Sequence, residues 1–200
     1  SKIINGIKYM KNNLDFYVKN YKGFLKNSLC DETIKQLKCF KNEWNEHTFY
    51  NRLTKKEVKL SGSKELSTMY TDDVTTKEEI MDKYWHVLND YICKYLNFKW
   101  FDSWESYSSL RFNKYKKNKE MAEHCDHITT IFNGTRKGVP ILSILCALNN
   151  DYSGGELIML GKKIDFKKGD VLVFPSSFMF PHKVNPVKKG TRYSAISWAW

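Results

Sequence analysis

The segment EMAEHCDHITTIF, residues 120–132, places two histidines and an aspartate side by side at His124, Asp126 and His127. The rest of this run is typical of a β-strand, in which successive side chains point to opposite faces. His124 and Asp126 are therefore expected on one face, where they can share a metal ion. His127 is expected on the other face, away from that ion.

A third metal ligand has to come from elsewhere in the chain. His47 and His86 lie in a part that reads as helical, which leaves His182, in FMFPHKVNPV at the start of a later predicted strand. Two imidazoles and one carboxylate leave the remaining positions of a divalent ion open, the arrangement in which non-haem iron(II) binds a cosubstrate and dioxygen. Zinc accepts the same three ligands, so the triad alone leaves both metals open.

Arg192 favours one of these chemistries. It stands on the predicted strand TRYSAISWAW, where alternation puts it on the same face as Ser194, Ile196 and Trp198. A guanidinium buried among such neighbours requires an anionic partner, and no acidic residue is close in sequence. A dicarboxylate that chelates the metal at one end could pair with Arg192 at the other, as 2-oxoglutarate would. Asp170 and Glu156 are the alternative partners from within the chain.

Two kinds of periodicity divide the sequence. In the first hundred residues, Asp31 can cap one helix and a second begins near Thr76. Apolar residues recur along both at helical spacing, at Ile34, Leu37, Phe40 and Trp44 in the first and at Ile80, Tyr84, Val87, Leu88, Tyr91, Ile92 and Tyr95 in the second. From about Ser106 short strand patterns alternate with turn signals.

This pattern predicts an α+β fold made of one domain. Residues 1–105 are expected to be mainly helical support, and residues 106–200 to form a jelly roll or similar barrel, with the helices packed on one outer face.

Composition narrows the partners and the compartment. The formal net charge is +11, but the lysines are spread over turns and solvated faces, so a nucleic-acid partner is not expected. The five cysteines form no CxxC pair and are expected to be reduced and mostly buried. No membrane span or signal peptide stands out, so we expect no membrane partner and a cytoplasmic protein, in the host cytoplasm if it is phage-encoded.

The order of these residues, Y-x8-H-x-D followed by H-x9-R, resembles the iron(II)/2-oxoglutarate dioxygenases, specifically the prolyl 4-hydroxylase-like branch. The segments YSGGELIML, FKKGDVLVFPSS and HKVNPVKKGTRYSAISW carry the same resemblance. It runs from about Leu110 to Trp200 and implies a double-stranded β-helix, or jelly-roll, core. The sequence departs from the common pattern at Met121, where an aromatic residue is frequent.

The resemblance implies roles for individual residues. His124, Asp126 and His182 would be the iron ligands, which are also the catalytic residues, and Arg192 would hold the C5 carboxylate of 2-oxoglutarate. Tyr115 falls where relatives use a tyrosine hydroxyl to help hold this cosubstrate. Trp198 falls where relatives have a tryptophan near the substrate; it could equally be a core aromatic.

The implied reaction hydroxylates a proline residue in a peptide or protein, while Fe(II) and O2 convert 2-oxoglutarate to succinate and CO2. Ascorbate is the expected reductant by the same resemblance. One alternative is the same chemistry on a free amino acid or on another protein side chain. The other alternative is a non-catalytic jelly-roll binding module. The nucleic-acid demethylase branch is disfavoured because RYSAISW lacks that branch's second arginine.

Overall fold

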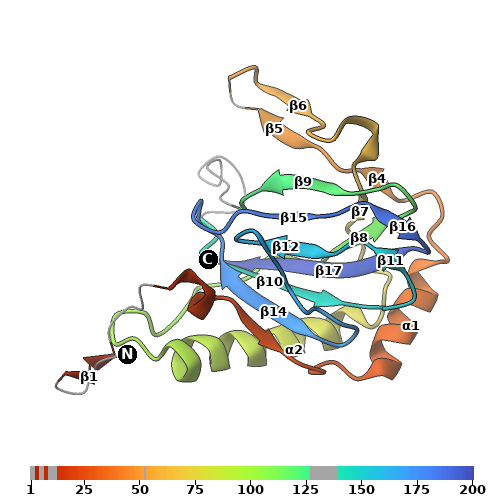
Figure 1. Cartoon of the computed structure of the whole chain (residues 1–200). Helices are drawn as coiled ribbons and strands as arrows, with labels where there is room; N and C mark the ends of the chain where they lie inside the picture. Colours follow the sequence, from red (N-terminus) through yellow and green to blue (C-terminus); the bar gives the residue numbers. More distant parts are fainter. Residues whose placement is uncertain (1–2, 5–6, 9–12, 52, 127–138) are drawn as a thin grey trace.

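Two antiparallel β-sheets face each other and enclose the centre of the molecule (Figure 1). The computed structural model describes residues 3–4, 7–8, 13–51, 53–126 and 139–200. Strands paired within each sheet come from distant parts of the sequence, and antiparallel pairing of this kind is the hallmark of a jelly roll. The predicted jelly-roll-like core is therefore confirmed.

The larger sheet contains seven strands, which are in spatial order β3 (Lys19–Tyr21), β14 (Val171–Pro175), β10 (Leu142–Ala147), β17 (Arg192–Ala199), β8 (Arg111–Tyr115), β7 (Ser67–Met69) and β4 (Asn45–Glu46). The smaller sheet contains four, β13 (Lys162–Lys163), β12 (Leu157–Met159), β15 (His182–Val184) and β9 (Met121–His124). Two-stranded ribbons pair β1 (Ile3–Ile4) with β2 (Ile7–Lys8), β5 (Phe49–Asn51) with β6 (Lys56–Val58), and β11 (Ser153–Gly154) with β16 (Val187–Lys189). The helical elements are η1 (Leu14–Tyr17), α1 (Asn27–Leu37), η2 (Gly62–Lys64), α2 (Lys77–Asn89) and the π-helical segment η3 (Asp90–Leu96).

Strands β10 and β17 form the middle of the larger sheet, and every residue of both is buried. Such strands are covered on both faces, so their apolar content is continuous rather than alternating. One face meets the smaller sheet, and the other meets α2. The hydroxyl of Tyr84 on α2 donates a hydrogen bond to the carbonyl oxygen of Ala195 on β17 at 2.9 Å.

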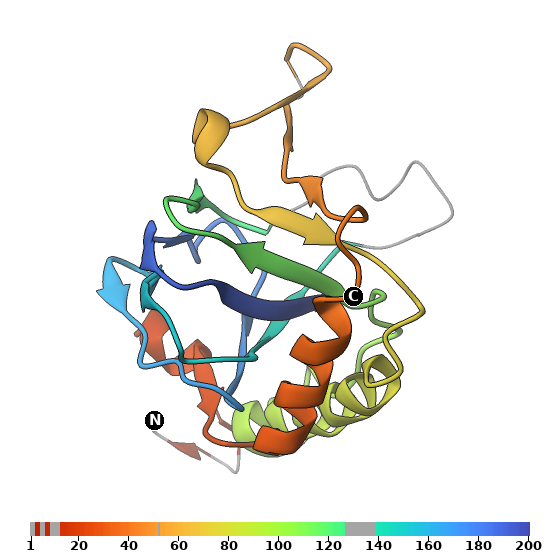
Figure 2. The same ribbon diagram turned by 90° about the vertical axis from the view of Figure 1, so that its right-hand side faces the viewer.

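The second predicted helix is confirmed, with Thr76 preceding its first residue. Its apolar stripe, extended through η3, is buried in the core. Helix α1 lies beside it, as Figure 2 shows, and the hydroxyls of Thr33 and Thr76 lie 2.7 Å apart between the two helices.

The predicted start of the first helix is wrong. Helix α1 begins at Asn27, before Asp31, and the residue that precedes it, Lys26, makes no side-chain cap. The carboxylate of Asp31 is instead paired with the ammonium group of Lys168 at 2.6 Å. The helix ends at Leu37, so the predicted apolar stripe is cut short and its last two members, Phe40 and Trp44, pack against the core from the chain that follows.

The first half of the chain also contributes strands. β3 forms one edge of the larger sheet, and β7 and β4 form the other, with β7 paired to β8. The β5–β6 ribbon projects away from the two sheets, at the top of Figures 1 and 2.

Two further observations concern the described residues. No helix among them has both the length and the apolar character required to cross a membrane. All five cysteines are free thiols, as expected, but only Cys30 and Cys146 are buried. Cys39 lies exposed in the turn that follows α1, and Cys93 lies exposed on η3, so the expectation of mostly buried cysteines is wrong.

The hydrogen bond of Tyr84 gives a first test of how α2 is attached. We expect Tyr84→Phe to lower the free energy of unfolding by about 1–2 kcal/mol, because the carbonyl of Ala195 is left buried without its donor. Tyr70→Phe is the matched control, since Tyr70 is 54% exposed. Equal changes for both variants in urea unfolding would contradict the assigned contact.

Candidate active site

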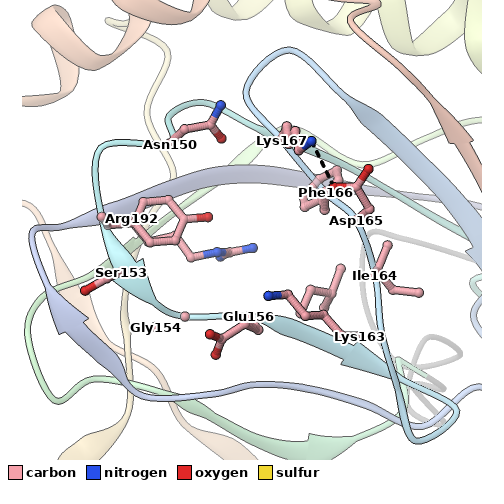
Figure 3. Close-up of a pocket in the computed structure, with 13 residues that line it drawn as sticks. Asn150, Ser153, Gly154, Glu156, Lys163, Ile164, Asp165, Phe166, Lys167 and Arg192 are labelled. Carbon is pink, nitrogen blue, oxygen red and sulfur yellow. Dashed lines mark ion pairs between the residues drawn. The ribbon is translucent and has the colours of Figure 1, made fainter.

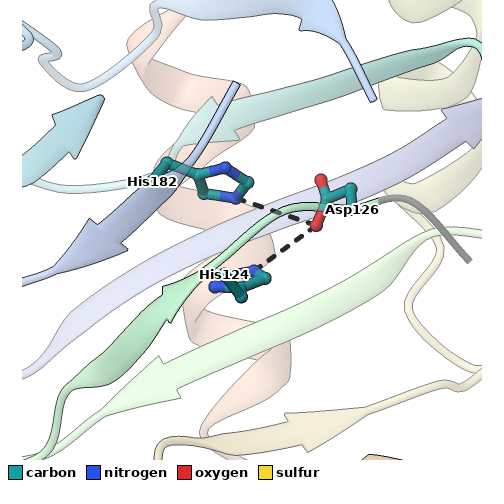
Figure 4. Close-up of side chains that lie close together, drawn as sticks. All are labelled: His124, Asp126 and His182. Atoms are coloured by element: carbon teal, nitrogen blue, oxygen red, sulfur yellow. Dashed lines mark ion pairs between the residues drawn. The ribbon is translucent and has the colours of Figure 1, made fainter. Parts of the chain in front are cut away.

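Three side chains from the smaller sheet converge on one point. His124 ends β9, Asp126 follows it, and His182 begins β15, directly opposite His124 in the strand pairing. The Nε2 atom of His124 lies 3.4 Å from Oδ1 of Asp126, and Nε2 of His182 lies 3.7 Å from the same oxygen (Figure 4). One ligand atom from each residue lies within 4.8 Å of those of the other two. These distances suit three ligands around one ion.

Hydrogen bonds on the outer side of the triad orient each member. The Nδ1 atom of His124 lies 2.8 Å from the carbonyl oxygen of Ala122, and Nδ1 of His182 lies 3.1 Å from that of Phe180. A hydrogen on Nδ1 satisfies each carbonyl, which leaves the Nε2 lone pairs directed at the centre. Nε2 of His124 is buried and has no hydrogen-bond partner among the described residues. This unpaired atom fits a site that receives a metal ion.

Asp126 is held in the same way. Its Oδ2 accepts a hydrogen bond from the hydroxyl of Ser143 at 2.7 Å, which leaves Oδ1 facing the imidazoles. Burial raises the pKa of Asp126, but the nearby His182, His124 and Ser143 outweigh burial, so the pKa lies well below its usual range. Burial lowers the pKa of His182. An ionised carboxylate and a neutral imidazole are the forms that bind a divalent metal.

A cavity between the two sheets joins the triad to Arg192. Its walls include His124, Asp126 and His182 on one side and Tyr115 and Arg192 on the other. The volume of this cavity is about 20 Å³, and both the triad and the guanidinium line it.

Arg192 is only 2% exposed, and its guanidinium donates a hydrogen bond to the hydroxyl of Ser194 at 3.2 Å. Its guanidinium lies 4.8 Å from the ring centre of Tyr115. No carboxylate in the described residues pairs with it, and the residues outside that part contain no aspartate or glutamate. The alternative partners are engaged elsewhere, because Asp170 accepts the backbone N–H of Gly23 and Glu156 accepts from Asn185.

The stem of Arg192 runs past Gly155, which has a φ of +63°. A Cβ at Gly155 would lie 2.9 Å from Cγ2 of Val187 and 3.2 Å from Cδ of Arg192. Glycine is therefore required there for both the left-handed conformation and the close approach.

Arg192 also borders a second pocket of about 500 Å³, shown in Figure 3. The ammonium group of Lys163 and the guanidinium of Arg192 point into it, while Lys167 pairs with Asp165 at 3.4 Å. Arg192 thus separates this outer pocket from the cavity of the triad.

Tyr115 and Trp198 lie where alternation predicts, on the inward face of the larger sheet. Burial raises the pKa of Tyr115, whose hydroxyl lies 3.7 Å from the sulfur of Met121. Met121 therefore forms part of the cavity wall, next to the tyrosine. Trp198 is 8% exposed, and its indole N–H has no acceptor in the described part of the chain.

Sequence reasoning missed other polar residues around the site. Ser143 stands alone in an apolar run, which was the available signal for its role. Arg111 and Asn113 share a face with Tyr115 and line the cavity. His47 was set aside as helical but lies in the loop between β4 and β5.

His47 lies near the triad, with Phe49 packed between it and His124. Nδ1 of His47 lies 3.5 Å from the carboxylate oxygen Oε2 of the fully buried Glu65. Burial, with a smaller contribution from Arg111, lowers the pKa of His47 to about 3. His47 is therefore neutral at ordinary pH.

The predicted placement of His127 on the far face lies outside the described residues.

Comparisons with known proteins find a family likeness over the second half of the chain. Residues 110–200 match the model of the 2OG-Fe(II) oxygenase superfamily. A PKHD-type hydroxylase of Gloeothece citriformis is 37% identical over 94 residues, covering 45% of this chain and 41% of the relative. One of Idiomarina loihiensis is 32% identical over 93 residues, covering 44% and 40%. The chain thus spans well under two thirds of the length of these relatives.

Solved structures extend the likeness of fold to nearly the whole chain. A Pseudomonas putida prolyl-4-hydroxylase has a TM-score of 0.63 at 19% identity and covers 91% of both chains. A Trichoplax adhaerens prolyl hydroxylase, solved with a hypoxia-inducible-factor peptide fragment, has a TM-score of 0.66 at 20% identity, covering 92% of this chain and 83% of that one. These matches confirm the resemblance drawn from the sequence: residues 110–200 match the 2OG-Fe(II) oxygenase superfamily, and the chain has a fold like that of the prolyl 4-hydroxylases.

Proposed function

We propose that this protein is an Fe(II)- and 2-oxoglutarate-dependent dioxygenase that hydroxylates a proline residue in a peptide or protein. The observation that carries the proposal is the cavity that joins a His-Asp-His triad to a buried arginine without a counter-ion. A metal site alone would fit many proteins. A metal site that shares its cavity with an unpaired cation fits a chelating dicarboxylate.

In this proposal His124, Asp126 and His182 hold the iron. The two Nε2 atoms and Oδ1 of Asp126 are the donors, because their other polar atoms are already engaged. Bound iron supplies the oxidative chemistry, with dioxygen as oxidant, that couples decarboxylation of 2-oxoglutarate to succinate with hydroxylation of the substrate. Ascorbate is proposed as the reductant that keeps the iron in the Fe(II) state.

Arg192 and Tyr115 hold the cosubstrate. The guanidinium of Arg192 forms a bidentate pair with the far carboxylate of 2-oxoglutarate, and the buried hydroxyl of Tyr115 donates to the same ligand. Trp198 contributes to the substrate side. The apolar walls around them exclude water from the cavity, which strengthens each of these polar contacts.

The choice of a prolyl substrate is supported by the relatives. Structural neighbours are prolyl hydroxylases, and one was solved with a peptide. We infer that the 200 residues act as a single domain, in which residues 1–105 support the outer face of the larger sheet and residues 106–200 carry the site. We also infer a cytoplasmic location, with no membrane or nucleic-acid partner.

The first prediction concerns the metal. After anaerobic incubation with Fe(II) and desalting, we expect about one iron per chain in the wild type and almost none in Asp126→Ala, by elemental analysis. Ser143→Ala should weaken iron binding about 10-fold or more, because Asp126 loses the hydrogen bond that orients it. His86→Ala is the control, since His86 is exposed on α2. Stoichiometric iron in Asp126→Ala would rule out the triad as the metal site.

The second prediction concerns the cosubstrate. Arg192→Leu should raise the KM for 2-oxoglutarate about 100-fold, since a buried charge-assisted pair is lost. Arg192→Lys keeps a charge but not the planar fork, so its KM should lie between those of the wild type and Arg192→Leu. Succinate release at varied 2-oxoglutarate measures both. An unchanged KM in folded Arg192→Leu would exclude this role.

The third prediction separates the candidate substrates. With Fe(II) and 2-oxoglutarate, succinate production should rise when proline-containing peptides are added, the peptide mass should increase by one oxygen, and both signals should vanish in His182→Ala. Turnover without peptide stimulation would favour a free amino acid or another side chain as substrate. Absence of any iron-dependent turnover would favour a non-catalytic binding module.

A further inference from the structure

We propose that Arg111 forms a binding subsite for a carboxylate group on the substrate, at a place in the cavity distinct from that of Arg192. The inference rests on the proposed function and deepens it, because it specifies a substrate that carries a carboxylate close to the residue that is hydroxylated. Arg111 lies on β8, at the start of the strand that ends with Tyr115.

The register of the larger sheet separates the two arginines. Arg192 is paired with Tyr115, whereas Arg111 is paired with Ile196. The two positions therefore stand four residues apart along the ladder, about 13 Å at the rise of a β-strand. The guanidinium of Arg192 lies over the ring of Tyr115, but that of Arg111 lies over the ring of Trp198, at 4.9 Å. The two guanidinium groups thus lie against different rings, so a ligand on Arg192 leaves Arg111 free.

Arg111 is held ready for a ligand by two contacts. Its Nε donates a hydrogen bond to Oδ1 of the buried Asn113 at 3.1 Å, and its guanidinium plane is supported by the indole of Trp198. In the part of the chain that the structure describes, the two terminal nitrogens have no hydrogen-bond acceptor. They form the fork that binds a carboxylate in bidentate fashion. Because the side chain is already fixed, little rotamer entropy remains to be lost on binding.

An anion from outside the chain would balance the charge of the Arg111 guanidinium. Arg111 is partly buried and lines the same cavity as His124 and His182. None of the described carboxylates pairs with it, and the remaining residues of the chain include no aspartate or glutamate. Asp126, the acidic residue of this cavity, is engaged by the triad and by Ser143. A partly desolvated guanidinium without a counter-ion is costly, and a substrate carboxylate would remove this cost.

Trp198 adds a second donor. Its indole N–H is buried and lacks an acceptor among the described residues. A carboxylate held by Arg111 would bring acceptor oxygens to the edge of this ring. In the proposed subsite, Trp198 supports the guanidinium of Arg111 and donates its indole N–H to the same carboxylate. This gives Trp198 the substrate role that the sequence suggested.

The required group is a carboxylate, and three sources could provide it. These are an aspartate or glutamate near the proline, the C-terminal carboxylate of a short peptide, and the carboxylate of free proline. All three present the same planar anion to Arg111. The sources differ in how far the anion stands from the reacting carbon, so matched substrates can separate them.

The experiment uses peptides capped at both ends, with one proline and one variable residue placed in turn at each of the two positions on either side of it. The variable residue is Asp, Asn or Lys. An uncapped peptide and free proline complete the set. We expect the wild type to prefer Asp to Asn at one or more positions, or to prefer the uncapped substrates, by about 10- to 100-fold in kcat/KM.

Variants at Arg111 should change this preference in a defined way. In Arg111→Gln the acidic-to-neutral ratio should fall to near one, and in Arg111→Glu it should invert in favour of Lys. Lys116→Gln is the matched control, because it removes one positive charge from an exposed residue just beyond β8 and should keep the wild-type ratio. A wild-type ratio near one for every source, or equal losses for acidic and neutral substrates in Arg111→Gln, would overturn the inference.

A binding measurement keeps this inference separate from the proposed function. Calorimetric titration of the Fe(II)-loaded protein with the same substrates, without oxygen, does not depend on turnover. If no substrate yields succinate, the proposed function fails; tighter binding of the acidic than the neutral peptide, lost in Arg111→Gln, would still support the subsite. Equal affinities, or no binding of either peptide, would overturn it.

Discussion

The pairing of His182 with His124 across β15 and β9 is the constraint on which the site depends. It brings together two imidazoles that are far apart in sequence. Backbone hydrogen bonds between the strands position them, without a contribution from side chains in the cavity. A shift of one residue in this register would turn one imidazole to the opposite face of the sheet. The other strand pairs of the smaller sheet, which place Met159 opposite His182 and Leu157 opposite Val184, hold the same register.

The second constraint is the burial of cations without counter-ions. Arg192 and Arg111 stand on the inward face of the larger sheet, opposite the triad, in a chain that carries 33 basic and 22 acidic residues. A fold whose interior was apolar at these two positions, with the acidic residues paired to surface lysines, would be more stable than the present fold. The fold instead keeps acidic side chains such as Asp170 and Glu156 occupied away from the cavity. The free energy given up in the unliganded protein would be recovered if anions bind as proposed.

The centre of this site could be predicted from the sequence because it follows from local rules. Alternation along one strand places His124 and Asp126 on one face, although the assigned strand ends at His124 and Asp126 continues the extended path beyond it. His182 was selected by elimination, although the reason for setting His47 aside was wrong, since His47 lies in a loop and not in a helix. Arg192 was recognisable because a cation with no acidic neighbour stood in an apolar strand.

The remaining features depend on contacts between distant segments, which a local pattern does not contain. The start of α1 was misplaced because Asp31, a good capping residue, pairs with Lys168 from another part of the chain. Strand β7 is three residues long and is stabilised by its pairing with β8, so its own sequence carries little signal. Arg111 was overlooked for the same reason. Its position in LRFNKY gives it a face, but only the packing of Trp198 shows that the guanidinium is fixed in the cavity.

Both histidines of the triad are oriented by the same device, a hydrogen bond between Nδ1 and the carbonyl of the residue two positions earlier. Such a bond joins residues that are two positions apart, so it orients the ring without a partner from a distant segment. Asp126 differs, because its orientation comes from Ser143 on the larger sheet, and the hydroxyl of Ser143 in turn lies 2.8 Å from that of Ser176. The orientation of the Asp126 carboxylate therefore depends on how the two sheets pack against each other. Because Asp126 depends on the docking of the sheets, the complete triad and the enclosed cavity form together, so a metal ion would be held tightly only where the arginines already face it.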